Sequence, residues 1–212
     1  MKNNELIYGS FFSYNSKPKS DSERIAKEKV REIKFDKMIE GKLWSQEISL
    51  LMKRDFEKLP FSNFFGKGTY LVPAPKSSLM VQDSLWVPSR IALAMSQKGF
   101  GIYFPCLERQ KSVNKAAFSK YEDRPKIIEH LDSLKINSML ITEKMERIVI
   151  IDDVTTTGAT LLGCALKLKE KFIEIPIFGF AVIRTVDDFK NFEEPFIGKI
   201  NEINNGRTHR ES

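Results

Sequence analysis

The sequence predicts an α/β fold in which a mostly parallel sheet is flanked by helices. After Gly68, short apolar runs alternate with stretches of helical periodicity, the pattern of successive strand–helix–strand units. The run Ile148–Ile151 is apolar at every position, as expected of a strand covered on both faces. The 212 residues are 42% apolar and 29% charged, a composition typical of a folded domain with a sizeable core.

The N-terminal third, residues 1–65, is expected to form an extended arm followed by a helical extension. A polar break after the arm contains Ser20 and Glu23 at capping-box spacing, which predicts a helix N-terminus. Apolar periodicity then predicts a helix to about residue 40. A second helix is predicted to begin near Trp44 and to end before Pro60.

The α/β core is expected over residues 66–186. The apolar runs that predict its strands are 70–72, 101–106, 138–141, 148–151 and 176–183. Helices are predicted between them at about 88–98, 124–134 and 158–172. Residues 187–212 remain as a C-terminal tail.

Composition and charge narrow the class of protein. No apolar run approaches the roughly 18 residues of a membrane helix, and the N-terminus lacks the features of a secretory signal. The two cysteines, Cys106 and Cys164, lie far apart in apolar surroundings, which predicts reduced thiols in a cytoplasmic protein. The net charge of +6 suits either a nucleic acid or a strongly anionic small molecule. Because the basic residues are spread out and no nucleic-acid-binding motif is present, a nucleic-acid partner is the less favoured interpretation.

The segment that carries chemistry is Ile148–Thr160, which reads IVIIDDVTTTGAT. Its strand brings Asp152 and Asp153 to the carboxyl edge of the sheet, where open α/β folds bind ligands. Paired carboxylates accept hydrogen bonds from vicinal hydroxyls or lie beside a divalent cation. The turn and helix N-terminus that follow suit a phosphate. The candidate phosphate-binding residues are Thr155, Thr156, Thr157, Gly158, Ala159 and Thr160.

This order of groups suits a ribose 5-phosphate, and other interpretations fit less well. Receiver domains and acid-rich metal sites also have acids after a strand, but they lack the T-T-G-x-T turn. A Walker A loop would require G-x-x-x-x-G-K-[ST], which the sequence does not contain. A dinucleotide-binding fold would have its glycine fingerprint after the first strand.

The segment resembles the 5-phosphoribosyl-1-pyrophosphate (PRPP) signature of type I phosphoribosyltransferases. That signature is four apolar residues followed by D-D-V-x-T-T-G-x-T, and all its characteristic positions match. The resemblance covers roughly residues 66–186 and is to the ComF-like and amidophosphoribosyltransferase-like group. It implies a type I phosphoribosyltransferase-like fold that binds PRPP with Mg²⁺ and transfers the phosphoribosyl group to a nitrogenous acceptor such as a nucleobase. Asp152 and Asp153 would orient the ribose near the metal.

The resemblance also implies two loops that contact pyrophosphate. The sequence V-P-A-P at 72–75 resembles the V-P-V-P of the ComF-like group, and the basic segment 107–126 lies where the family has a loop that closes over PRPP. The candidates for pyrophosphate contacts are Ala74, Lys76 and Ser77 in the first loop and Arg109 and Lys111 in the second. For Lys76 the pyrophosphate contact is favoured over a solvent-facing lysine on a proline-stiffened turn, whereas Arg109 and Lys111 are equally explained as solvated surface charges.

Family members cover the site with a variable hood that recognises the base. Residues 1–65 and the tail 187–212 are available for it. Arg184 is the candidate base contact, although it could equally cap the sheet edge. The tail phenylalanines could stack on a base, but packing on the core is the favoured interpretation. A homodimer is an option that the family leaves open, and the alternative function is a catalytically silent module that binds PRPP or a nucleotide.

Overall fold

The computed structural model describes all residues except 1–3, 80–82, 114–125 and 204–205. Its strands are β1 (Glu5–Tyr14), β2 (Met38–Ile39), β3 (Lys42–Leu43), β4 (Thr69–Pro73), β5 (Ile102–Tyr103), β6 (Leu107–Arg109), β7 (Leu134–Ile136), β8 (Arg147–Thr155), β9 (Ile177–Thr185), β10 (Glu193–Ile203) and β11 (Arg207–Arg210). Its α-helices are α1 (Asp21–Lys34), α2 (Trp44–Asp55), α3 (Val87–Gln97), α4 (Ile127–Asp132) and α5 (Ala159–Lys169), and short 3-10 helices span Phe56–Lys58 and Ser62–Phe64.

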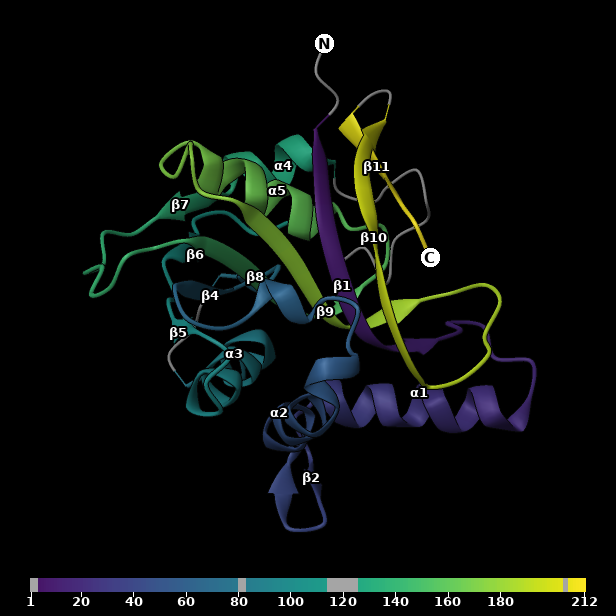
Figure 1. The fold of residues 1–212 in the computed structure, drawn as a ribbon. Helices are drawn as coiled ribbons and strands as arrows, with labels where there is room; N and C mark the ends of the chain where they lie inside the picture. The colour runs from purple at the N-terminus through teal and green to yellow at the C-terminus, as the bar shows by residue number, and fades with distance from the viewer. Residues whose placement is uncertain (1–3, 80–82, 114–125, 204–205) are drawn as a thin grey trace.

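Within this described part of the chain, seven strands form the central sheet in the order β11-β10-β1-β9-β8-β4-β5 (Figure 1). Strands β1, β9, β8, β4 and β5 run parallel to one another. Strands β10 and β11 extend the sheet beyond β1 as antiparallel additions. The predicted α/β class with a mostly parallel sheet is confirmed.

Helices cover both faces of this sheet, as the side chains of β8 demonstrate. Val149 and Ile151 join the core that includes residues of α1, α2 and α3, whereas Ile148 and Ile150 join the core that includes residues of α4 and α5. In Figure 1 the first three helices lie below the sheet and the other two above it. All four side chains are fully buried, which explains why β8 is apolar at each of these positions.

Several helices begin where the sequence predicts. Ser20 caps α1: its hydroxyl accepts from the Glu23 N–H at 3.3 Å, and the Glu23 carboxylate accepts from the Ser20 N–H at 2.7 Å. Helices α3 and α5 lie within or close to their predicted ranges. The cysteines Cys106 and Cys164 are buried free thiols, as predicted, and burial raises the pKa of each to about 12. No helix in the described ranges is both long and apolar enough to cross a membrane.

The strand predicted at residues 138–141 is wrong. The chain has no regular structure there, and Leu140 is 83% exposed. The strand of this region is β7, in which Leu134 is buried and which pairs with β6 outside the central sheet. Helix α4 ends at Asp132, so the chain is already extended at Leu134. A short apolar run without alternation does not distinguish a strand from an exposed loop, which explains the error.

The N-terminal arm and the C-terminal tail both contribute strands to the central sheet. Strand β1 lies between β9 and β10, with Tyr8 paired to Gly179 on one side and to Gly198 on the other. The predicted boundaries at 65 and 186 therefore do not separate independent sheets. Helices α1 and α2 form the helical part of the N-terminal region, but its first strand is part of the core.

Candidate functional site

The two segments expected to bind phosphate groups lie side by side at one edge of the sheet. Strands β4 and β8 are parallel neighbours in which Pro73 pairs with Ile151. One residue further, the Ala74 N–H donates to the Ile151 carbonyl at 2.8 Å. The loop that begins at Ala74 and the turn that follows the acids of β8 therefore open at the same carboxyl edge, the usual ligand-binding edge of such sheets.

The acidic pair belongs to β8 itself, which continues to Thr155. Asp152 is 8% exposed, Asp153 is half-buried, and the Asp153 N–H donates to Asp152 Oδ1 at 3.0 Å. Burial, and after it the charge of Asp153, raise the pKa of the Asp152 carboxyl well above its usual range. Within the described ranges, neither Asp152 nor Asp153 forms an ion pair with a lysine or arginine. A strongly perturbed, unpaired carboxyl at a sheet edge is typical of a ligand-binding group.

The turn after β8 requires glycine at its centre. Gly158 is the N-cap of α5 and has a φ of +83°, in the left-handed region. A Cβ at this position would lie 2.7 Å from Ile200 Cδ1, so Ile200 also leaves no room for a side chain. Thr155 is buried, whereas Thr156, Thr157 and Thr160 are half-buried, and the Ala159 N–H lies 3.5 Å from Thr157 Oγ1. Backbone N–H groups of a first helical turn lack intrahelical partners, which suits them to an anion.

In the loop after β4, three backbone carbonyl groups accept hydrogen bonds from residues further along the chain. Trp86 Nε1 donates to the Ala74 carbonyl at 2.8 Å, Arg109 Nε donates to the Lys76 carbonyl, and the Val113 N–H donates to the Ser77 carbonyl at 2.8 Å. In a trans peptide the C=O and the following N–H point in opposite directions. The N–H groups of Ser77 and Ser78 are therefore directed away from these internal partners. The Lys76 and Ser77 side chains are half-buried.

The two basic candidates of segment 107–126 have different environments. Arg109 is 2% exposed in β6, donates also to Ser133 Oγ, and its Nη2 has no hydrogen-bond partner in the part of the chain that is described. Burial lowers the pKa of its guanidinium, while Cys164 and Asp152 act in the opposite direction. Arg109 is thus fixed beneath the β4 loop, which differs from its expected place on a closing loop. Lys111 is exposed, and the segment from 114 to 125 lies outside the described residues.

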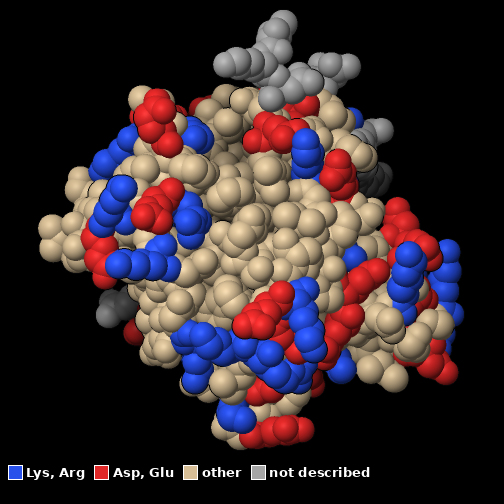
Figure 2. Space-filling model, in the orientation of Figure 1, with Lys and Arg blue, Asp and Glu red and all other residues tan. Residues whose placement is uncertain are grey.

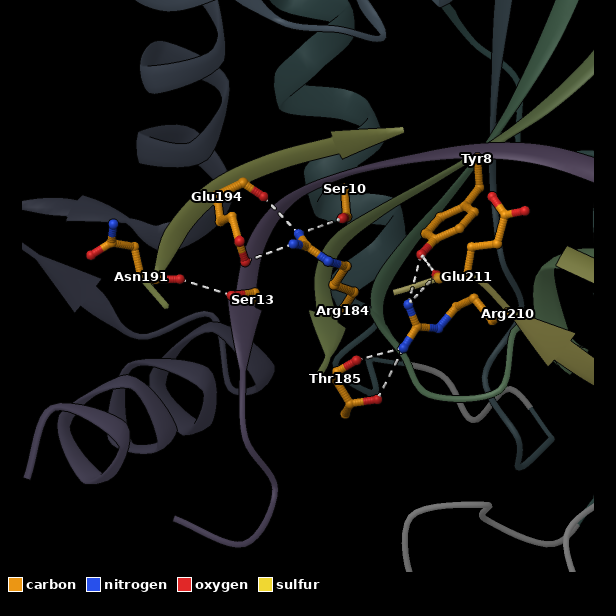
Figure 3. A network of polar contacts seen from close by, with 9 residues as sticks. All are labelled: Tyr8, Ser10, Ser13, Arg184, Thr185, Asn191, Glu194, Arg210 and Glu211. Atoms are coloured by element: carbon orange, nitrogen blue, oxygen red, sulfur yellow. Dashed lines mark hydrogen bonds and ion pairs between the residues drawn. The ribbon is translucent and has the colours of Figure 1, made fainter. Parts of the chain in front are cut away.

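The candidate base contact, Arg184, is an internal residue of the sheet. It is 2% exposed, pairs with the Glu194 carboxylate at 2.7 Å, and donates to Ser10 Oγ at 3.2 Å (Figure 3). Its guanidinium also lies 4.6 Å from the centre of the Phe196 ring. Phe192 stacks on Phe12 with ring centres 4.4 Å apart. Arg184 thus pairs with β1 on one side and β8 on the other, and its guanidinium is bonded within the fold. The contacts of Phe192 and Phe196 agree with the interpretation of the tail phenylalanines as packing residues.

Two residues near the site are missing from the sequence-based candidates. Arg210 of β11 donates through Nε to the Thr156 carbonyl at 2.7 Å, inside the turn that is expected to bind phosphate. Tyr14, at the end of β1, is buried, and its pKa is raised by burial and then by the charge of Asp153. Only the strand order reveals either residue, since neither lies in a recognisable motif.

Charge on the face shown in Figure 2 is mixed. Lysine and arginine side chains alternate with aspartate and glutamate side chains around it, and no continuous basic surface is seen. This face therefore adds no support for a nucleic-acid partner.

The chain matches no protein-family model, and no similar sequence was found among curated proteins. Among the residues that the structure describes, no group of three or more His, Cys, Asp or Glu side chains could hold a metal ion. The resemblance to phosphoribosyltransferases thus stays a prediction that depends on the motif, and the strand order is compatible with it.

Proposed function

We propose that the protein binds PRPP at the carboxyl edge of β4 and β8 and transfers its phosphoribosyl group to a nitrogenous acceptor. The observation that carries this proposal is the adjacency of the two motifs, since Ala74 bonds to Ile151, the residue directly before the acidic pair. The 5′-phosphate would lie at the turn of residues 155–160 and the pyrophosphate at the loop that begins at Ala74. The ribose would lie between them.

The reaction breaks the bond between ribose C1 and the pyrophosphate oxygen and forms a bond from C1 to the acceptor nitrogen, which loses a proton. Positive charge grows on the ribose as negative charge leaves with pyrophosphate. The carboxylates of Asp152 and Asp153 would orient the ribose hydroxyls and stabilise this charge. The turn would hold the 5′-phosphate, so that binding energy remote from C1 fixes the reacting centre.

The acidic pair also fits a magnesium ion. Mg²⁺ prefers carboxylate and phosphate oxygens and is usually held by one or two carboxylates together with the substrate phosphates. Burial, and after it the charge of Asp153, raise the pKa of the Asp152 carboxyl, and a cation bound beside it would favour the charged form. Asp152 and Asp153 would therefore hold the ion jointly with the ligand, and the ion would neutralise charge on the pyrophosphate.

A second candidate function is a catalytically silent module that binds PRPP or a nucleotide. One observation favours it: Arg109 and Arg184, two of the basic residues expected to face the ligand, are buried and already bonded within the fold. Binding alone needs fewer charges around the leaving group than transfer does.

Pyrophosphate release distinguishes these functions. The protein is incubated with PRPP, Mg²⁺ and a panel of purine and pyrimidine bases, and released pyrophosphate is measured alongside PRPP binding by calorimetry. Release that depends on one of the bases supports the transferase. Binding and thermal protection by PRPP without release with any base support the silent module. Absence of PRPP binding would contradict both.

A further inference from the structure

We propose that Arg210 is a positioning residue for the phosphate-binding turn, which makes the tail strand β11 part of the ribose 5-phosphate site. This inference rests on the proposed function for the identity of the ligand. Arg210 is distant in sequence from the signature, and it contacts the turn only because β10 and β11 extend the sheet beyond β1.

The Arg210 guanidinium joins three segments of the chain. Its Nε donates to the Thr156 carbonyl at 2.7 Å. Its Nη1 donates to the Tyr8 hydroxyl at 2.6 Å and its Nη2 to the Thr185 carbonyl, as Figure 3 shows. Further contacts join Nη1 to the Glu211 carbonyl at 2.9 Å and Nη2 to Thr185 Oγ1 at 3.4 Å. An arginine has five N–H donors, and these contacts provide an acceptor for each. Arg210 therefore acts through the turn and has no donor left for a phosphate oxygen.

The contact with Thr156 sets the direction of the next amide group. Because the C=O and N–H of a trans peptide point in opposite directions, a Thr156 carbonyl directed to Arg210 turns the Thr157 N–H away from it. Thr157 is the central threonine of the signature and directly precedes the helix N-cap, Gly158. Successive N–H groups held in one direction at such a turn form an anion-binding concavity.

The tail supports the same turn at a second point. Ile200 of β10 packs so closely against Gly158 that no Cβ would fit. Ile200 pairs with Arg210 across the β10–β11 ladder, so the two contacts come from neighbouring positions. The tail thus fixes the turn through one polar contact and one apolar contact.

The test uses Arg210→Ala and Arg210→Lys in the full chain, with binding of ribose 5-phosphate and of inorganic pyrophosphate measured separately by calorimetry. We expect Arg210→Ala to weaken ribose 5-phosphate binding by about tenfold or more, with pyrophosphate binding within about twofold of wild type. Arg210→Lys should show the same selectivity, because an ammonium cannot reproduce the planar fork. Hydrogen exchange at residues 156–160 should be faster in both variants without any ligand.

Two controls separate positioning from general destabilisation. His209→Ala changes an exposed side chain on the same strand, and Val30→Ala removes packing on the opposite face of the sheet. Neither should change the ratio of the two affinities. An unchanged ratio in Arg210→Lys, or unchanged exchange at the turn, would overturn the inference. If the wild-type protein binds neither ligand, the proposed function fails, whereas the exchange measurement still tests the support of the turn. Should Arg210→Ala not fold, Arg210→Lys is judged by the same criteria.

Discussion

The turn after β8 and the loop after β4, the two segments proposed to bind phosphate groups, are each held by an arginine, but the hydrogen bonding of the two arginines differs in completeness. At the turn after β8, Arg210 has an acceptor for every donor, and Ile200 packs against Gly158. At the loop after β4, Arg109 is buried with Nη2 unpartnered within the described ranges, and the neighbouring His130 also has an unpartnered buried nitrogen, Nδ1. An unsatisfied buried donor costs free energy, and a ligand or water that reaches it recovers that cost. The turn after β8 is therefore preorganised, whereas Arg109 and His130 beside the loop after β4 can still bond to a ligand or a water molecule.

The largest loss of activity is expected from substitution of the acidic pair, Asp152 and Asp153, whose carboxylates would contact the ribose of the proposed ligand. The double variant Asp152→Asn, Asp153→Asn should lower pyrophosphate release by at least about a hundredfold, because it removes the charges beside the ribose. The fold should not be weakened. A carboxyl whose pKa is raised in the folded protein destabilises the fold as pH rises through the unfolded pKa, so asparagine at 152 should raise the melting temperature at pH 7. A lower melting temperature, or undiminished release, would refute the assigned role.

Acid should lower the free energy of unfolding through His130, which lies near Arg109. Burial, followed by the charge of Arg109, lowers the pKa of His130 to about 4. Because the unfolded state then binds the proton more readily, stability should fall as pH decreases from about 6.5 to about 4, by up to about 3 kcal/mol. His130→Asn should flatten this part of the curve of unfolding free energy against pH, measured by urea denaturation. Equal slopes for the variant and the wild type would contradict the assignment.

A substitution in the turn separates backbone strain from the contact with the tail. Gly158→Ala should cost more stability than Gly41→Ala, because both glycines have left-handed φ values near +80° but only Gly158 lies against another side chain. The common strain is about 1–3 kcal/mol. Equal unfolding free energies of the two variants would show that the Ile200 side chain moves aside without lowering the stability of the protein. Binding of ribose 5-phosphate should be weakened only in Gly158→Ala.

The smallest effect is expected from Arg109, and it should mirror that of Arg210. Arg109→Met keeps much of the side-chain volume but removes the donor to the Lys76 carbonyl. We expect pyrophosphate binding to weaken severalfold and ribose 5-phosphate binding to stay within about twofold. If the variant instead lost ribose 5-phosphate binding selectively, Arg109 would support the turn after β8 and not the loop after β4.

Much of the site could be predicted from local sequence, but its supports could not. The apolar run before Asp152, the capping box at Ser20 and the T-T-G-x-T turn are short-range patterns with direct physical meaning. They predicted the class of fold, several helices and the groups at the sheet edge. The misassigned segment 138–141 shows the limit of such patterns, since an apolar run carries no information about pairing.

The supports depend on pairing between distant segments. Strand β1 is buried from Tyr8 to Tyr14 without an alternating pattern, so its place between β9 and β10 follows only from the packed sheet. Arg210 reaches Thr156, and Arg109 reaches Lys76, through that same long-range arrangement. A basic residue in a tail or a loop looks the same in sequence whether it is solvated or holds a distant carbonyl group.

Calorimetric competition on the wild-type protein with Mg²⁺ tests directly whether the turn after β8 and the loop after β4 bind one ligand. If the turn and the loop form one PRPP site, ribose 5-phosphate and pyrophosphate should each bind, and PRPP should bind with one-to-one stoichiometry and displace both. Failure of PRPP to bind, or binding that leaves either smaller ligand in place, would contradict the account.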